Sequence, residues 1–100
     1  MRRIMVRYRV KPDQAARNEE LVRAVYEELH RRETERIRYA TFRLDDGVTF
    51  VHIAEIDSNH NPLTDLQAFR DFQEGAVDRC DEPPVTTALN EIGSFHLFAR

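Results

Sequence analysis

The sequence predicts a single α+β domain, residues 1–100, in which two helices cover one face of a four-stranded antiparallel sheet. Three observations support this prediction. A chain of 100 residues has room for one hydrophobic core. Its apolar residues follow a strand period in several segments and a helix period in others. The segments come in the order strand, helix, strand, strand, helix, strand, and two right-handed strand–helix–strand units in that order fold into such a sheet.

The first predicted strand covers residues 4–10, where apolar and mostly basic residues alternate. The residues on its apolar face are Ile4, Val6, Tyr8 and Val10. Pro12 ends this strand, because proline lacks the N–H that a central strand donates. A helix is predicted from there to about Arg32, since apolar residues between Leu21 and Leu29 recur at helical spacing.

The second and third predicted strands form a hairpin. They cover residues 37–44 and 48–56, and Asp46-Gly47 lies between them. Asp-Gly between two strand-like runs is a strong hairpin signal. A polar turn follows, in which Asn61 or Thr64 can cap the next helix.

The second helix is predicted to extend to Cys80. Its apolar stripe consists of Leu66, Phe69, Phe72, Ala76, Val77 and Cys80. Pro83-Pro84 is expected to end this helix, and a last strand is expected from about Leu89 to Phe98. The complete set is the ferredoxin-like βαββαβ plait, with the first strand between the third and the fourth.

Both faces of the third predicted strand are mostly apolar. One face carries Phe50, His52, Ala54 and Ile56, and the other carries Thr49, Val51, Ile53 and Glu55. Two helices can cover only one face of the sheet, and a monomer rarely leaves an apolar face exposed. We therefore expect a homodimer in which two copies of the chain pack sheet to sheet.

Charged residues of the first strand point toward that second face. Because the first strand lies beside the third and the fourth, Arg7 and Arg9 are expected to pair with Glu55 and Glu91, within one chain or across the dimer interface. Pairing that sets the strand register is the simpler interpretation, and an anion site is the alternative.

The composition argues against several classes of function. Basic and acidic residues alternate along residues 17–36, which is typical of a solvated helix face and not of a nucleic-acid surface. No apolar run approaches the roughly 20 residues that span a bilayer, and the first ten residues lack the layout of a signal peptide. We expect a cytoplasmic protein that binds neither nucleic acid nor membrane. Cys80 is the one cysteine, so no intrachain disulfide is expected.

Three segments are similar to a known family. They are IMVRYRVKP as first strand, FVHIAEIDSNHNPLTDLQAFRDF as strand, turn and helix, and DEPPVTTALNEIGSFHLF as the return strand. On these segments the chain resembles the antibiotic biosynthesis monooxygenase-like family of dimeric α/β barrels. The resemblance implies a plait that dimerises through its sheet. It also implies either a cofactor-independent monooxygenase acting on quinols and polyketide aromatics or a haem-degrading enzyme.

Haem degradation is not expected. The haem-degrading branch of that family uses an Asn, a Trp and a His, and the corresponding positions fall near Val6, Ile56 and Gln73 here. All three residues depart from the pattern, and the chain contains no Trp.

Oxygenation without a cofactor needs a base that deprotonates an electron-rich substrate, and a dry pocket. His52 is the candidate base, because it is the one ionisable residue on an otherwise apolar strand face. Tyr8 from the neighbouring strand is expected to hydrogen-bond to His52 or to orient the substrate. The residues expected to contact the substrate are Phe69, Phe72, Ile56 and Tyr39. The alternative is a core histidine that one polar partner satisfies.

Neither a metal nor a cofactor is expected. The set His52, Asp57 and His60 has no known ligand spacing, and no phosphate-binding glycine loop occurs. Two functions remain open. One is a cofactor-independent monooxygenase acting on a small quinol-like or polycyclic aromatic compound. The other is a non-catalytic dimer that binds a small molecule or has a structural role. A cavity beside His52 would favour a site there.

Overall fold

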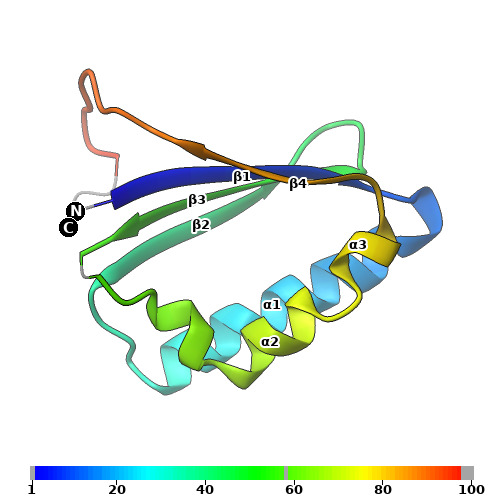
Figure 1. Ribbon diagram of the computed structural model, residues 1–100, viewed down its shortest axis with the longest axis horizontal. Helices are drawn as coiled ribbons and strands as arrows, with labels where there is room; N and C mark the ends of the chain where they lie inside the picture. The colour runs from blue at the N-terminus through cyan, green and yellow to red at the C-terminus, as the bar shows by residue number, and fades with distance from the viewer. Residues whose placement is uncertain (1, 58, 98–100) are drawn as a thin grey trace.

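The computed structural model describes residues 2–57 and 59–97. Its four strands form one antiparallel sheet in the order β2-β3-β1-β4. The strands are β1 (Arg2–Val10), β2 (Ile37–Arg43), β3 (Thr49–Ile56) and β4 (Cys80–Ala88). Helices α1 (Ala15–Arg31) and α2 (Gln67–Gln73) lie together on one face of this sheet, as Figure 1 shows. The predicted α+β plait, with the first strand between the third and the fourth, is confirmed.

The opposite side of the sheet carries no helix (Figure 1). We call it the open face. The side chains that the strand pairing directs there include Met5, Phe42, Val51, Ile53 and Val85. In the part of the chain that the structure describes, no helix combines the length and the apolar character needed to cross a bilayer.

The register of β1 against β3 sets which side chains meet under the helices. Val6 lies opposite His52, and Tyr8 lies opposite Phe50. Directly opposed residues of an antiparallel pair point to the same face, and diagonal neighbours remain within reach of long side chains. Tyr8 and His52 are such a diagonal pair, so the register places the phenol beside the imidazole.

The core under the helices is divided into two clusters. One cluster contains the buried residues Tyr8, Val10, Ala15 and Phe50, and the other contains Val25, Leu63 and Leu66. Phe72 of α2 packs against both clusters. The buried side chain of His52 lies between them, because Tyr8 on one side of it belongs to the first cluster and Tyr39 on the other side packs against the second.

A residue of α1 stabilises the first turn of helix α2. A short 3-10 helix (Pro62–Asp65) precedes it, and the Asn61 side chain caps that turn by accepting from the Leu63 N–H. The N-cap position of α2 itself is Leu66, whose side chain offers no acceptor. The Glu28 carboxylate of α1 accepts from the Ala68 N–H at 2.9 Å instead. This bond lowers the pKa of Glu28 and fixes α2 against α1.

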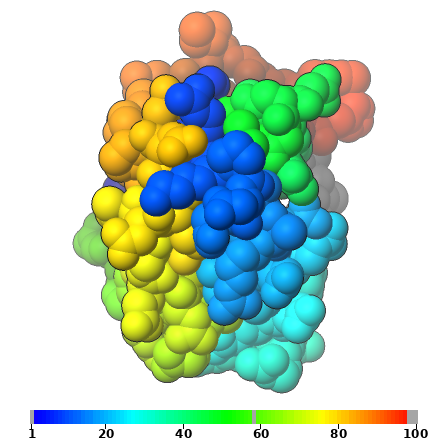
Figure 2. All heavy atoms as spheres, turned by 90° about the vertical axis from the view of Figure 1, so that its right-hand side faces the viewer, coloured from blue at the N-terminus to red at the C-terminus, as the bar shows by residue number. Residues whose placement is uncertain are grey.

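The predicted end of the second helix is wrong. Helix α2 stops at Gln73, and a turn through Gly75 with φ +77° leads into the short helix α3 (Ala76–Arg79). The last strand then begins at Cys80, so the prediction of a strand from Leu89 to Phe98 is also wrong. Figure 2 shows this end of the molecule, where the yellow residues of α3 lie beside the blue residues that lead into α1.

Pro83 and Pro84 do not end a helix, because they lie inside β4. This strand is at the edge of the sheet, where proline is tolerated. The register against β1 shifts between the pairs Arg7–Val85 and Arg9–Glu82, so one extra residue of β4 bulges out beside the prolines. After β4, the chain over residues 89–97 is irregular and exposes Ile92, Phe95 and Leu97. Phe98 lies outside the described residues.

The expected ion pairs of the open face form with other partners. Arg3 lies directly opposite Glu55, and its Nε donates to the Glu55 carboxylate at 2.7 Å. A second nitrogen of Arg3 is 3.5 Å from Glu91. Arg9 pairs with Glu82 at 3.5 Å. Within one chain, the prediction that Arg7 and Arg9 meet Glu55 and Glu91 is therefore wrong, because the register places a different arginine at that end of the sheet.

Replacing Gly75 with alanine tests the turn between α2 and α3. The left-handed backbone at this position disfavours a Cβ, so Gly75→Ala is expected to lower the free energy of unfolding by about 1–2 kcal/mol. Urea unfolding followed by circular dichroism measures the change. Gly93→Ala is the matched control, because its backbone is not left-handed and nothing lies within 4 Å of its added Cβ. Equal stability of both variants would contradict this account.

Candidate functional site

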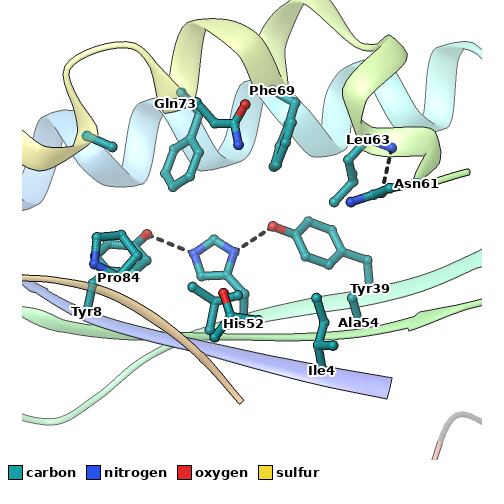
Figure 3. A pocket seen from close by; sticks show the side chains of 14 residues that line it. Ile4, Tyr8, Tyr39, His52, Ala54, Asn61, Leu63, Phe69, Gln73 and Pro84 are labelled. Atoms are coloured by element: carbon teal, nitrogen blue, oxygen red, sulfur yellow. Dashed lines mark hydrogen bonds between the residues drawn. The ribbon is translucent and has the colours of Figure 1, made fainter. Parts of the chain in front are cut away.

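A cavity of about 340 Å³ lies between the sheet and α2. Figure 3 shows it from close by, with strand residues below and α2 above. The labelled side chains that reach it from the strands include Ile4, His52 and Ala54, and those from α2 are Phe69 and Gln73. Most of the lining is apolar, and the imidazole of His52 lies in the middle of the floor. The cavity beside His52 that would favour a site is thus present.

Both ring nitrogens of His52 are hydrogen-bonded to tyrosines. Nε2 is 2.7 Å from the Tyr8 hydroxyl, and Nδ1 is 2.5 Å from the Tyr39 hydroxyl (Figure 3). The Thr41 hydroxyl, directly opposite His52 on β2, is 3.1 Å from Nδ1. Only 4 % of His52 is exposed, so these partners replace the water that its nitrogens lose on folding.

The partners of Tyr8 decide which nitrogen carries the proton. Arg79 Nε can only donate, and it points at Asn18 Oδ1 at 3.4 Å, so the Asn18 amide presents its NH₂ group to Tyr8. Asn18 Nδ2 donates to the Tyr8 hydroxyl at 2.9 Å. The Tyr8 hydroxyl accepts that bond and gives its own proton to His52 Nε2. We therefore assign the His52 proton to Nδ1, from which it is donated to Tyr39 and Thr41.

Burial keeps His52 and its tyrosine partners uncharged at neutral pH. It lowers the pKa of His52 to about 4, because the imidazolium ion loses its hydration. Burial also raises the pKa of the phenols of Tyr8 and Tyr39 well above the ordinary value, and it raises the pKa of Tyr26 to about 12. Neutral His52 has a lone pair on Nε2 and can accept a proton that a ligand delivers.

The structure brings most of the sequence-predicted residues together around the cavity. Its lining includes Tyr8, His52, Tyr39, Phe69 and Phe72. The ring centroids of His52 and Phe72 are 5.6 Å apart, so the aromatic wall covers the imidazole. The structure corrects the expectation that Ile56 contacts the substrate, because Ile56 does not line the cavity. It lies opposite Arg2 and Ile37 at the end of β3, where it is buried in the core.

Sequence reasoning missed the residues that support the tyrosines. Asn18 is buried on the face of α1 that also holds Leu21, Val22 and Val25, so a polar residue in an apolar stripe was an available signal. Arg79 gave no such signal, because its guanidinium reaches Asn18 only through the turn at Gly75. Asn61, Gln73 and Thr86 add polar groups to the lining.

The metal alternative finds no support in the geometry. His52 uses both ring nitrogens for tyrosines, and His60 pairs with Asp65 at 2.9 Å in the exposed turn. Across the described residues, no cluster of three His, Cys, Asp or Glu side chains could hold a metal ion.

No protein-family model matches the sequence, and no curated protein matches it. Solved structures match the fold. One is named "Putative antibiotic biosynthesis monooxygenase from Nitrosomonas europaea", with a TM-score of 0.74 and 17 % identity over 91 % of this chain and 89 % of that chain. Rv0793 from Mycobacterium tuberculosis has a TM-score of 0.72 and 16 % identity, covering 93 % and 96 %.

A third structure extends the match over nearly the whole chain. It is a "putative antibiotic biosynthesis monooxygenase" from Bacteroides thetaiotaomicron, with a TM-score of 0.75 and 14 % identity over 99 % of this chain and 95 % of that chain. The chain has the fold of the antibiotic biosynthesis monooxygenases. The resemblance seen in the sequence is confirmed at this level. Identities of 14–17 % show a shared fold, and the roles of individual residues stay predictions.

Acidification is expected to destabilise the protein through His52. In the folded chain its pKa is about 4, below the ordinary value of 6.5, so the unfolded chain takes up the proton first. Neutral His52 makes its full contribution to the free energy of unfolding above pH 6.5. This contribution decreases by up to about 3 kcal/mol as the pH approaches 4. Urea unfolding between these pH values measures this slope. His52→Gln is the control, since it should lose this part of the slope, and equal slopes would contradict the assignment.

Proposed function

We propose that this chain is a cofactor-independent monooxygenase that acts on a small quinol-like or polycyclic aromatic compound, with His52 as the base. One observation supports this most directly. A neutral, buried imidazole lies in the floor of an apolar cavity, with tyrosine hydroxyls on both of its nitrogens. The fold is shared with structures that are named "putative antibiotic biosynthesis monooxygenase", which is consistent with this chemistry.

The substrate reaches His52 through a tyrosine. Because the Tyr8 hydroxyl already donates to Nε2, a substrate hydroxyl that binds Tyr8 can pass its proton to that oxygen while Tyr8 passes its own to Nε2. The result is a substrate anion beside an imidazolium ion. In the empty cavity His52 is a weak base, and the bound anion raises its pKa because an opposite charge favours the protonated form.

The anion then reduces dioxygen. In a hydroxylated polycyclic aromatic compound, the ring carbon para to the hydroxyl loses its hydrogen and becomes a carbonyl. In a quinol, whose para carbon carries the second hydroxyl, a neighbouring ring C–H becomes C–OH and the ring is oxidised to the quinone. One atom of dioxygen enters the product, and the other leaves as water. The substrate supplies all the electrons, so the balance needs no external reductant. The apolar lining around Phe69 and Phe72 keeps water from the reactive intermediate. A volume of about 340 Å³ is at the lower end for ligand pockets, which favours a small substrate.

We also propose that a second copy of the chain covers the open face. A row of paired residues crosses this face, from Phe42 through Val51 and Arg7 to Val85. Phe42 is 52 % exposed and Val85 is 64 % exposed. A patch of this kind is typical of an interface, and a two-fold axis through the sheet would bury both copies at once.

A non-catalytic dimer that binds a small molecule, or that has a structural role, is the second candidate. The observation that favours it is the completeness of the polar network. Among the described residues, no buried side-chain nitrogen or oxygen lacks a hydrogen-bond partner. A network that is satisfied without a ligand is also what a structural core histidine requires.

Oxygen uptake distinguishes these candidates. The purified protein is tested with a panel of quinols and hydroxylated polycyclic aromatics, and His52→Ala is expected to lower turnover roughly 100-fold, which is the effect of losing a general base. His60→Ala is the matched control, because His60 lies in the exposed turn outside the cavity. Circular dichroism checks that each variant folds. Uptake no faster than the uncatalysed rate on every compound would reject the monooxygenase and favour the non-catalytic dimer.

The dimer is tested by light scattering at micromolar concentration. The native chain is expected to have the mass of two copies, and Phe42→Asp is expected to have the mass of one, since a carboxylate within the interface is costly to desolvate. Val77→Asp is the control, because Val77 is 67 % exposed on α3, away from the open face. A monomeric mass for the native chain would overturn the proposal.

A further inference from the structure

Two hydroxyl groups extend the network of His52 away from the cavity. Thr41 Oγ1 is 3.1 Å from His52 Nδ1 and 2.7 Å from the hydroxyl of Tyr26 on α1. Neither Thr41 nor Tyr26 lines the cavity. Both line a separate depression of about 280 Å³ between α1 and β2, where charged side chains such as Glu19 and Arg43 meet solvent.

We propose that Thr41 and Tyr26 form a proton path that connects His52 with solvent at the surface of α1 and β2. This inference rests on the proposed role of His52 as proton acceptor. In the path, the imidazolium ion that forms when Nε2 gains a proton from the cavity side gives its Nδ1 proton to Thr41 Oγ1. Thr41 passes its own proton to Tyr26, and Tyr26 passes one to water. One proton enters and one leaves, and each hydroxyl accepts one and donates one.

The chemistry of the groups favours this direction over the other branch. On the cavity side of His52, the network continues from Tyr8 to Asn18 and ends at Arg79. An amide does not relay protons in this way, and the guanidinium stays protonated. That branch therefore holds Tyr8 in place without conducting. A hydroxyl both accepts and donates, so the branch through Thr41 and Tyr26 contains only groups that can conduct. Tyr39, the other hydroxyl on Nδ1, lines the cavity and therefore leads back to the substrate side.

The path begins at the cavity and ends at the surface between α1 and β2, so it would let His52 exchange protons while a substrate fills the cavity. A bound substrate and the apolar side chains around it exclude water from the cavity side of His52. Thr41 lies opposite His52 on β2 and is only half-buried, as is Tyr26. His52 can then exchange protons with solvent through its Nδ1 side while the cavity is occupied.

The rate at which the His52 Nδ1 proton exchanges with water tests the path without any substrate. Nuclear magnetic resonance of ¹⁵N-labelled protein gives this rate, and the ¹⁵N shifts report which nitrogen is protonated. Thr41→Val and Tyr26→Phe are expected to slow the exchange roughly tenfold, the factor that corresponds to one lost hydrogen bond. Thr41→Ser keeps the hydroxyl and is expected to restore the native rate.

Thr86→Val is the matched control, because Thr86 lines the cavity but takes no part in the path. Its exchange rate is expected to equal the native one. Shifts that place the proton on Nε2 would overturn the proposal, as would equal rates in the native protein, Thr41→Val and Tyr26→Phe. A signal lost through fast exchange in all of these proteins alike counts as that same negative result.

The outcome is separable from that of the oxygen-uptake experiment. Slowed exchange in Thr41→Val with no turnover on any compound would support the proton path and reject the monooxygenase. Turnover that depends on His52, with exchange unaffected by Thr41→Val, would support the monooxygenase and reject the proton path.

Discussion

The hydrogen bonds of His52 to Tyr8 and Tyr39 are the interaction on which the rest of the structure depends. A buried imidazole is costly unless both nitrogens are paired, and the two phenols supply those partners at 2.7 and 2.5 Å. The strands must then hold three polar side chains between two apolar clusters. The cavity lies beside this polar centre, and its lining includes Tyr8 of the first cluster and Leu63 of the second.

Arg79 connects this polar centre to the course of the chain. It is a buried guanidinium that donates to the carbonyls of Phe72 and Glu74 at the end of α2, and to Asn18 of α1. Helix ends leave carbonyls without partners, and a buried cation beside them also interacts favourably with the helix dipole. The break at Gly75 allows Arg79 to fold back onto that end. The shape of this turn and the orientation of Tyr8 are therefore coupled.

The two faces of the sheet carry different features. The helix-covered face holds the cavity and its hydrogen-bond network, and the open face holds an apolar row with Phe42 and Val85 exposed. Alternation along each strand keeps the two sets of side chains apart. The fold itself does not decide function, since related architectures host many activities. The arrangement of hydroxyls around His52 is the chemical feature of the helix-covered face.

The sequence by itself determined the order of elements, the hairpin at Asp46-Gly47 and the side-by-side placement of Tyr8 and His52, because periodicity and turn chemistry are local. It misplaced the last strand, because Pro83-Pro84 ends helices in general and is tolerated here only in a bulged edge strand. Only the tertiary structure decided which groups hold the Tyr8 hydroxyl in place. Asn18 and Arg79 are 61 positions apart, and such contacts come from packing, which no local pattern records.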